Sequence, residues 1–243
     1  MKTQPIQAKT RHALLPITER RPRSAAAEAY RTLRTNLQFT NLAEAYRSLV
    51  FTSATAGEGK TTTASNFSVA TAQSGTRVCL IDADLRRPSL HKMFDLPNRS
   101  GLTTALIGSE SVESLALETR VPNLFVVPSG PQPPNPAELV ASARMREVIA
   151  EAQTAFDLVV LDTPPIISVA DPVAISAQCE GVIIVIRASK VPLEVIRRAI
   201  SQVAAVKARI IGVVLNRVNL RQEGYYYKYY HYYRSYYSPS EKS

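Results

Sequence analysis

Six short runs of consecutive apolar residues occur along the chain, and helix-compatible stretches lie between them. The apolar runs fall at residues 49–51, 78–81, 124–127, 158–161, 182–186 and 210–215, and the main helical stretches at residues 60–73, 136–155 and 192–206. A strand that is apolar at every position is buried on both faces, because successive side chains point to opposite sides of a sheet. The pattern therefore predicts an α/β fold, with a mostly parallel β-sheet flanked by helices on both faces.

Both ends of the chain depart from this pattern. Residues 1–23 contain three prolines and several charges without periodicity, which indicates a flexible, extended basic leader. From Ser24 the composition becomes helical, with Leu33, Leu37 and Leu42 at four- and five-residue steps, so one amphipathic helix is expected over residues 25–45. The expected organisation is a leader at residues 1–23, one domain at residues 24–220 and a tail at residues 221–243.

The formal net charge of +9 belongs mostly to these appendages. Between residues 51 and 220 the sixteen Lys and Arg residues are nearly balanced by fifteen acids. A basic leader could meet nucleic acid, anionic lipid or an acidic partner, although a solvated, disordered leader is the simpler interpretation. The longest aliphatic run is far shorter than the roughly 20 residues that span a bilayer. We therefore expect a soluble, cytoplasmic protein, and its two cysteines suit a reducing compartment.

A phosphate-binding loop is predicted directly after the first strand. The segment Ala-Thr-Ala-Gly-Glu-Gly-Lys-Thr-Thr at residues 54–62 follows that strand and opens a helix, with Ala54 at the place of the usual first glycine. Its small residues let backbone N–H groups approach phosphates, Lys60 would place a cation on the β- and γ-phosphates, and the Thr61 hydroxyl would bind Mg²⁺. The expected nucleotide-binding residues here are Ala56, Gly57, Glu58, Gly59, Lys60, Thr61 and Thr62.

Three carboxylates stand at the ends of two later strands. Asp82 and Asp84 follow the second apolar run, and Asp162 follows the fourth. Open α/β sheets bind ligands at this edge. Acids at strand ends are often only turn formers, but three of them beside a phosphate loop favour Mg²⁺ ligands and a proton acceptor. We assign Thr61, Asp84 and Asp162 to Mg²⁺ and Asp82 to the base, and the choice between Asp82 and Asp84 as the base stays open.

Nine of the eleven tyrosines lie in the last nineteen residues. A packed domain spreads its aromatic residues, so this cluster is expected to be exposed and offered to a partner or an enzyme. The simpler interpretation is an aromatic tail that binds other proteins, and the interleaved Lys228 and Arg234 also permit stacking on single-stranded nucleic acid. The nucleotide site upstream favours phosphorylation instead. The expected phosphorylation sites are Tyr225, Tyr226, Tyr227, Tyr229, Tyr230, Tyr232, Tyr233, Tyr236 and Tyr237.

Together these motifs resemble the bacterial tyrosine kinases of capsule and exopolysaccharide synthesis, which have a P-loop NTPase fold. The resemblance covers roughly residues 24–237 and rests on the phosphate loop, the segment at residues 82–86, the Asp162 strand and the tyrosine cluster. Chromosome-partitioning and septum-positioning ATPases share the nucleotide motifs. They carry an extra lysine where this chain has Thr55, which favours the kinase.

The resemblance implies two further groups of residues. Glu28, Arg31 and Arg34 match the family's Glu-x-x-Arg-x-x-Arg motif for ring-like self-assembly, in which one subunit's tail reaches a neighbour's active site. Without the family, a local Glu28–Arg31 surface pair would be the preferred interpretation. Asn216 and Arg217 match the place where such ATPases hold adenine, although a strand-end turn is nearly as good an explanation.

The hypothesis is thus an ATP- and Mg²⁺-dependent tyrosine autokinase that phosphorylates the tail of a neighbouring subunit and regulates polysaccharide synthesis and export. The family implies a membrane-anchored polysaccharide co-polymerase or adaptor that activates the kinase and recruits it to the inner face of the cell membrane. It also implies a cognate tyrosine phosphatase, and no nucleic-acid partner is expected. The alternatives are a partitioning-type ATPase switch that binds DNA or membrane, and a nucleotide-binding scaffold without turnover.

Overall fold

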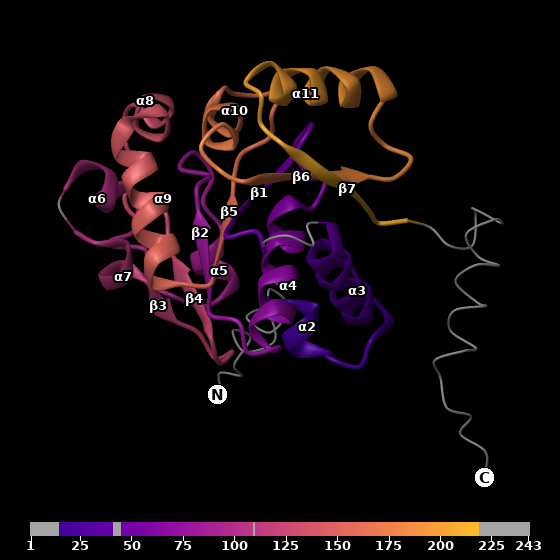
Figure 1. Cartoon of the computed structure of the whole chain (residues 1–243), viewed down its shortest axis with the longest axis horizontal. Helices are drawn as coiled ribbons and strands as arrows, with labels where there is room; N and C mark the ends of the chain where they lie inside the picture. Colours follow the sequence, from indigo (N-terminus) through magenta and orange to yellow (C-terminus); the bar gives the residue numbers. More distant parts are fainter. Residues whose placement is uncertain (1–14, 41–44, 109, 219–243) are drawn as a thin grey trace, which may run out of the picture.

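One seven-stranded sheet organises the computed structural model, which describes residues 15–40, 45–108 and 110–218. Its strand order is β3-β4-β2-β5-β1-β6-β7 (Figure 1). All neighbouring strands are parallel except the short edge strand β3, which runs antiparallel to β4. The strands are β1 (Ser48–Ser53), β2 (Val78–Asp82), β3 (Leu117–Glu118), β4 (Leu124–Val127), β5 (Leu158–Asp162), β6 (Gly181–Arg187) and β7 (Ile210–Asn216).

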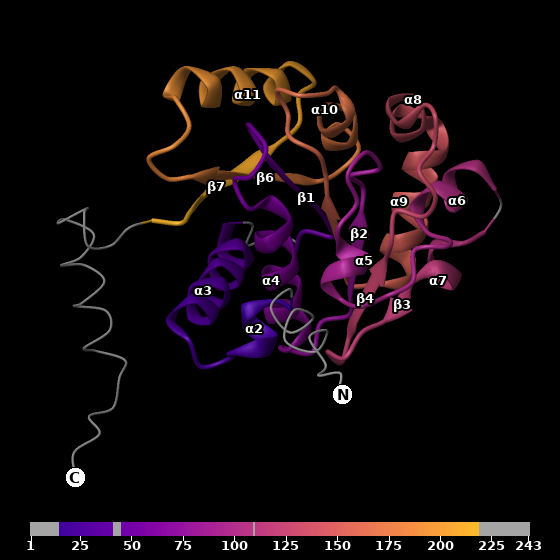
Figure 2. The same ribbon diagram turned by 180° about the vertical axis from the view of Figure 1, so that it is seen from behind.

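Helices cover both faces of this sheet, as the two opposite views show (Figures 1 and 2). One face carries α2 (Ile17–Arg20), α3 (Ala25–Thr40), α4 (Lys60–Ala72) and α5 (Leu90–Met93). The other carries α6 (Leu102–Ile107), α7 (Val112–Leu115), α8 (Pro136–Ala141), α9 (Ala143–Ala155), α10 (Asp171–Ser176) and α11 (Leu193–Ala205). None of the helices within the described ranges has the length and apolar character needed to cross a bilayer.

The central strands are apolar because each contributes side chains to two hydrophobic cores, one on each face of the sheet. In β1, Val50 packs in the core beneath α9, α10 and α11, whereas Leu49 and Phe51 pack in the core beneath α3 and α4. Phe51 also meets Phe67 of α4, with ring centroids 5.2 Å apart. This two-sided burial confirms the predicted α/β fold and its mostly parallel sheet.

The strand order positions the functional elements. The first strand, β1, lies between β5 and β6, so the chain leaves β1 at a point where the strand order changes direction. β2 pairs with the edge of β5 that faces away from β1, and the last residues of these two strands, Asp82 and Asp162, are in register. The loop after β1 and the carboxylates that end β2 and β5 therefore meet at one edge of the sheet, where open α/β sheets bind ligands.

The helix expected over residues 136–155 is two helices. Ser142 is extended between α8 and α9, and its hydroxyl accepts a hydrogen bond from the Met145 N–H at 3.3 Å. Serine favours the N-cap because its side chain satisfies a backbone donor that the first turn leaves unpaired. The short elements β3, α5, α6, α7 and α10 also went unpredicted, because two to six residues carry little periodicity.

The expectation of an extended leader does not hold near its end. Residues 17–20 form α2, and Thr18 is buried against α4. The Asn66 side-chain oxygen accepts hydrogen bonds from the Thr18 N–H at 2.9 Å and from its hydroxyl at 3.0 Å. The following helix, expected over residues 25–45, is described as α3 to Thr40, and residues 41–44 lie outside the described part of the chain.

Replacing Asn66 tests whether α2 is an integral part of the fold. Asn66→Ala leaves two buried donors of Thr18 without their acceptor, so we expect the free energy of unfolding to fall by about 1–3 kcal/mol. Urea denaturation of the full chain measures this change. Gln73→Ala is the control, because Gln73 is exposed and its contact to the Thr18 carbonyl is long, at 3.4 Å. Equal stability of the two variants would show that α2 contributes little.

Candidate active site

The loop between β1 and α4 has the backbone shape of an anion cradle. Gly57 and Gly59 adopt φ values of 79° and 95°, a left-handed region that side chains with a Cβ rarely enter. A Cβ added to Gly59 would also collide with the Asn216 amide nitrogen. The thirteen-residue helix α4 starts at Lys60, so the unpaired N–H groups of its first turn and its positive dipole end meet the loop.

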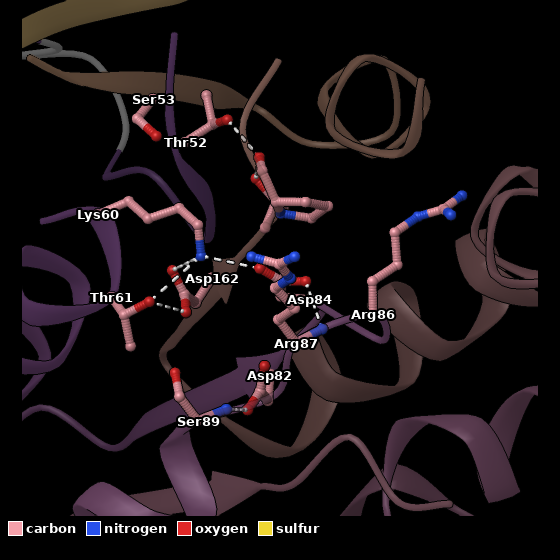
Figure 3. Close-up of polar contacts among 12 residues, drawn as sticks. Thr52, Ser53, Lys60, Thr61, Asp82, Asp84, Arg86, Arg87, Ser89 and Asp162 are labelled. Atoms are coloured by element: carbon pink, nitrogen blue, oxygen red, sulfur yellow. Dashed lines mark hydrogen bonds and ion pairs between the residues drawn. The ribbon is translucent and has the colours of Figure 1, made fainter. Parts of the chain in front are cut away.

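Lys60 joins this loop to the carboxylates at the strand ends (Figure 3). Its Nζ lies 3.1 Å from Asp84 Oδ2 and 3.4 Å from Asp162 Oδ1. The Thr61 hydroxyl donates a hydrogen bond to Asp162 Oδ2 at 2.7 Å. The structure therefore brings together four of the predicted residues, Lys60, Thr61, Asp84 and Asp162, from three separate segments of the chain.

The electrostatics of this cluster follow from its burial. Burial alone would lower the pKa of Lys60, but the carboxylates of Asp162 and Asp84 raise that pKa above its usual value. Burial raises the pKa of Asp162, which has no exposed surface, while Lys60 and the Thr61 hydroxyl oppose that rise. The ammonium group thus stays charged and holds two carboxylates that would otherwise repel each other.

Asp82 is placed differently from the other two acids. Its Oδ2 accepts hydrogen bonds from the backbone N–H groups of Ser89 and Leu90, both at 2.9 Å, at the start of α5 (Figure 3). Its Oδ1 is buried and has no hydrogen-bond partner among the described residues. Burial, and then the nearby Asp162 carboxylate, raise the pKa of Asp82 to about 7, against the opposing hydrogen bonds and Lys60.

Asp84 has both carboxylate oxygens engaged. Oδ2 pairs with Lys60, and Oδ1 accepts the Arg87 N–H at 3.0 Å. Two carboxylates next to one charged ammonium are common in structural ion-pair networks as well as active sites, so the pairing alone does not define a role. Asp84 has a partner on each carboxylate oxygen, whereas Oδ1 of Asp82 has none among the described residues, and this difference separates their chemistry.

The oxygen atoms of the cluster fit a magnesium ion carried in with a nucleotide. Mg²⁺ prefers hard oxygen ligands and is usually held by one or two carboxylates together with substrate phosphates. Thr61, Asp84 and Asp162 supply such oxygens beside the anion cradle. Within the described ranges, no three His, Cys, Asp or Glu residues form a metal cage of their own, as a structural metal would require.

The remaining predicted nucleotide-binding residues lie around the loop. Ala56 and Gly57 are exposed in the loop, and Thr62 is exposed in the first turn of α4. Glu58 is buried, and Asn216, at the end of β7, donates a hydrogen bond to the Glu58 carbonyl at 2.9 Å. Arg217 follows with a positive φ of 57° and is exposed. The sequence predicted the loop residues, and the resemblance implied that Asn216 and Arg217 hold adenine, but neither gave a sign of the contact between Glu58 and Asn216.

One ion pair near the site was also not anticipated. The Arg86 guanidinium meets the Asp171 carboxylate through two hydrogen bonds, at 2.8 and 3.1 Å, and Asp171 is almost fully buried at the start of α10. This pair ties the segment after β2 to the opposite helical layer. The sequence showed only that Asp171 precedes Pro172, a pattern typical of a helix start. No pattern in the neighbouring residues linked Asp171 to Arg86.

The predicted assembly residues all lie on α3. Glu28 and Arg31 form an ion pair at 2.6 Å. Arg34 donates a hydrogen bond to the Ala70 carbonyl in the last turn of α4 at 2.9 Å, so it also serves the packing of these two helices. The nine tail tyrosines, Tyr225 to Tyr237, lie outside the described residues.

Comparisons with known proteins agree with this geometry. A family model described as ParA, NUBPL iron-transfer P-loop NTPase, matches residues 45–232. The chain is 42% identical to the tyrosine-protein kinase YwqD of Bacillus subtilis (strain 168), covering 84% of this chain and 88% of the relative. It is 34% identical to the putative tyrosine-protein kinase CapB of Staphylococcus aureus, covering 92% and 98%. The kinase domain of the Escherichia coli tyrosine kinase ETK superposes with a TM-score of 0.78 at 30% identity, covering 84% and 81%.

The raised pKa of Asp82 predicts an effect on stability in the chain without nucleotide or metal. The folded state keeps a proton that an unfolded aspartate releases near its ordinary pKa of about 4, so this group weakens folding as the pH rises from about 4 to about 7. Asp82→Asn removes the buried charge. We therefore expect its melting temperature to exceed that of the parent by a few degrees at pH 8, with the gap closing towards pH 5.

Differential scanning calorimetry across this pH range measures the gap. Glu110→Gln is the control, because it removes an exposed carboxylate far from the loop and the strand ends. A difference between Asp82→Asn and the parent that stays constant from pH 5 to pH 8 would show that Asp82 titrates normally.

Proposed function

Because the chain belongs to the bacterial tyrosine-protein kinases of the P-loop NTPase class, we propose that it transfers the γ-phosphate of ATP to tyrosines in the C-terminal tail of a neighbouring copy. The family membership confirms the resemblance drawn from the motifs, and it makes the chain a nucleotide-binding kinase. Its choice of ATP, the metal, the roles of single residues and transfer between copies are parts of the proposal.

The observation that carries the proposal is the position of Lys60. It stands at the first turn of α4, beside the glycine loop, and contacts the carboxylates that end two other strands. In the proposed complex, Lys60 and the N–H groups around Gly57 and Gly59 hold the phosphates, while Thr61, Asp84 and Asp162 hold Mg²⁺. Bound magnesium would neutralise charge that develops on the phosphate oxygens.

The transfer itself needs a group that takes the phenolic proton. As the tyrosine oxygen forms its bond to the γ-phosphorus, the bond between that phosphorus and the bridging oxygen breaks, and ADP leaves. We assign the proton to Asp82 Oδ1, which is unpaired among the described residues, whereas both oxygens of Asp84 are engaged. A carboxyl group with a pKa near 7 is also well matched to proton transfer at neutral pH.

Transfer between copies rests on the residues of α3 and on the tyrosine cluster. Arg31 and Glu28 lie on the outer part of α3, where they could meet a neighbouring subunit. Unmodified, residues 221–243 carry four basic residues against two acids, so the tail would be attracted to the acids of the acceptor site. Each phosphotyrosine adds roughly 1.5 to 2 negative charges, which would oppose return of the tail.

In the cell, we propose control of capsular or extracellular polysaccharide synthesis and export. The kinase would be cytoplasmic and recruited to the inner face of the membrane by an anchored adaptor that activates it, and a tyrosine phosphatase would reverse its action. A partitioning-type ATPase shares the fold, but the kinase names of the relatives and Thr55 in place of a second loop lysine favour the kinase. A nucleotide-binding scaffold without turnover differs from the proposed kinase only in lacking phosphorylation activity, so an activity measurement separates the two.

Replacing Lys60 tests the active-site assignment. Lys60→Met removes the cation that would neutralise the phosphates, so we expect phosphorylation of the tail to fall by at least about a hundredfold. Incubation with Mg-ATP followed by mass spectrometry of the tail peptides measures the loss. Lys190→Met, which removes an exposed lysine, should keep parental activity. Persistent phosphotyrosine in a folded Lys60→Met chain would disprove the assignment.

Replacing Arg31 tests assembly and transfer between copies. Arg31→Ala should lower both the mass of the assembly and the phosphorylation of a Lys60→Met chain added as acceptor, because both require contact between subunits. Both arginines also bond within their own chain, Arg31 to the Pro22 carbonyl and Arg34 to the end of α4, so the melting temperature of each variant is measured alongside. Light scattering and isotope-coded mass spectrometry give the two readouts.

Arg197→Ala, an exposed arginine on α11, is the control for Arg31. If the inactive acceptor chain gains no phosphotyrosine from an active partner at any concentration, transfer does not occur between copies.

A further inference from the structure

Glu58 places a negative charge in a loop that is proposed to bind phosphates, which are also negative. A carboxylate at this position would repel a nucleotide if it faced the cradle, yet Glu58 is only 2% exposed. Its Oε1 accepts hydrogen bonds from the Thr55 N–H and from the Thr55 hydroxyl, the latter at 3.0 Å. Its Oε2 accepts the Arg187 N–H at the end of β6, at 3.1 Å. The charge is thus turned into the protein and satisfied by three donors.

Asn216 holds the same residue from the other side. Its Nδ2 donates to the Glu58 carbonyl at 2.9 Å, and its Oδ1 accepts the Arg217 N–H at 2.8 Å. The Asn216 carbonyl in turn accepts the Ala188 N–H at 2.9 Å. The same amide occupies the space where any side chain on Gly59 would have to go.

We propose that Glu58 and Asn216 are positioning residues that brace the phosphate-binding loop against the ends of β6 and β7. Glu58 fixes the start of the loop through Thr55, and Asn216 fixes its middle through the Glu58 carbonyl. Hydrogen bonds to a buried carboxylate are stronger than neutral ones, so the loop keeps its shape before nucleotide arrives. A loop that is already ordered loses less entropy when it binds.

The brace makes a specific kinetic prediction, which rests on the proposed nucleotide site. Among the described residues, neither the Glu58 carboxylate nor its donors share a hydrogen bond or ion pair with the Lys60 cluster, so the brace acts on nucleotide affinity and not on the reacting atoms. Loss of the brace should therefore raise the dissociation constant and the KM for ATP, while kcat at saturating ATP stays close to the parental value.

The central variant is Glu58→Gln, which keeps the size of the side chain. Its amide nitrogen must face at least one of the N–H groups that Glu58 accepts, so one hydrogen bond is replaced by repulsion. We expect about a tenfold or greater loss of affinity for Mg-ADP and Mg-ATP by isothermal titration calorimetry, with kcat changed less than about twofold. Thr55→Ser is the matched control, because it retains both donors to Glu58.

Two further measurements separate the brace from other roles. In Glu58→Gln, at least one of the two backbone amides that bond to Glu58, those of Thr55 and Arg187, should exchange hydrogen faster than in the parent. Asn216→Ala should weaken the binding of inorganic pyrophosphate, which has no base, as Glu58→Gln does. Unchanged pyrophosphate binding in Asn216→Ala would instead leave Asn216 with a role towards the base alone and would remove it from the brace.

The outcomes distinguish this inference from the proposed function. If the parent chain binds no Mg-ADP or Mg-ATP, the nucleotide site itself is wrong and the brace falls with it. If the parent binds both nucleotides, Glu58→Gln binds them equally well, and the Thr55 and Arg187 amides stay protected from hydrogen exchange, only the brace is wrong. If Glu58→Gln does not fold, Thr55→Val is used instead, because it removes only the hydroxyl donor to Glu58. Parental nucleotide affinity in Thr55→Val, together with parental pyrophosphate binding in Asn216→Ala, would contradict the brace.

Discussion

The structure depends on one electrostatic constraint, the burial of three carboxylates around a single ammonium group. Asp82, Asp84 and Asp162 lie at the ends of two neighbouring strands, and Lys60 compensates for only part of their charge. Such a cluster is unfavourable without further cations, because burial and mutual repulsion both oppose ionisation. A site of this kind is suited to a ligand that brings metal ions with it, because added cations would offset the repulsion among the carboxylates.

The parallel sheet is what makes this cluster possible. β2 and β5 end in register, and the loop after β1 leaves the sheet beside β5, where the order of the strands along the sheet reverses. Apolar residues buried on both faces hold these strands rigidly, so the acids are fixed by the core and not by the loops that carry them. The polar contacts of Asp82 with α5 and of Arg86 with α10 then attach the surrounding helices to the same edge.

The sequence predicted the features that depend on local patterns. Continuous apolar runs gave the main strands, and the glycine loop before Lys60 gave the start of α4, because each is encoded within a few adjacent residues. The break at Ser142 and the helix α2 were missed, since one depends on a single capping hydroxyl and the other on contact with Asn66. The Arg86–Asp171 pair and the contacts of Glu58 join distant segments, and a single sequence offers no signal for such pairs.

The attachment of Asn216 to the loop also sets a distance scale for the rest of the chain. Asn216 is fixed beside the phosphate cradle, and Tyr225 and Tyr237 follow it by nine and twenty-one residues. A polypeptide spans at most about 3.6 Å per residue, so the chain length limits the distances of these tyrosines from that anchor to at most ~32 Å and ~76 Å. If transfer occurs between copies as proposed, the distance between the two sites would limit which tyrosine hydroxyls can reach the neighbouring site, whatever their local sequence.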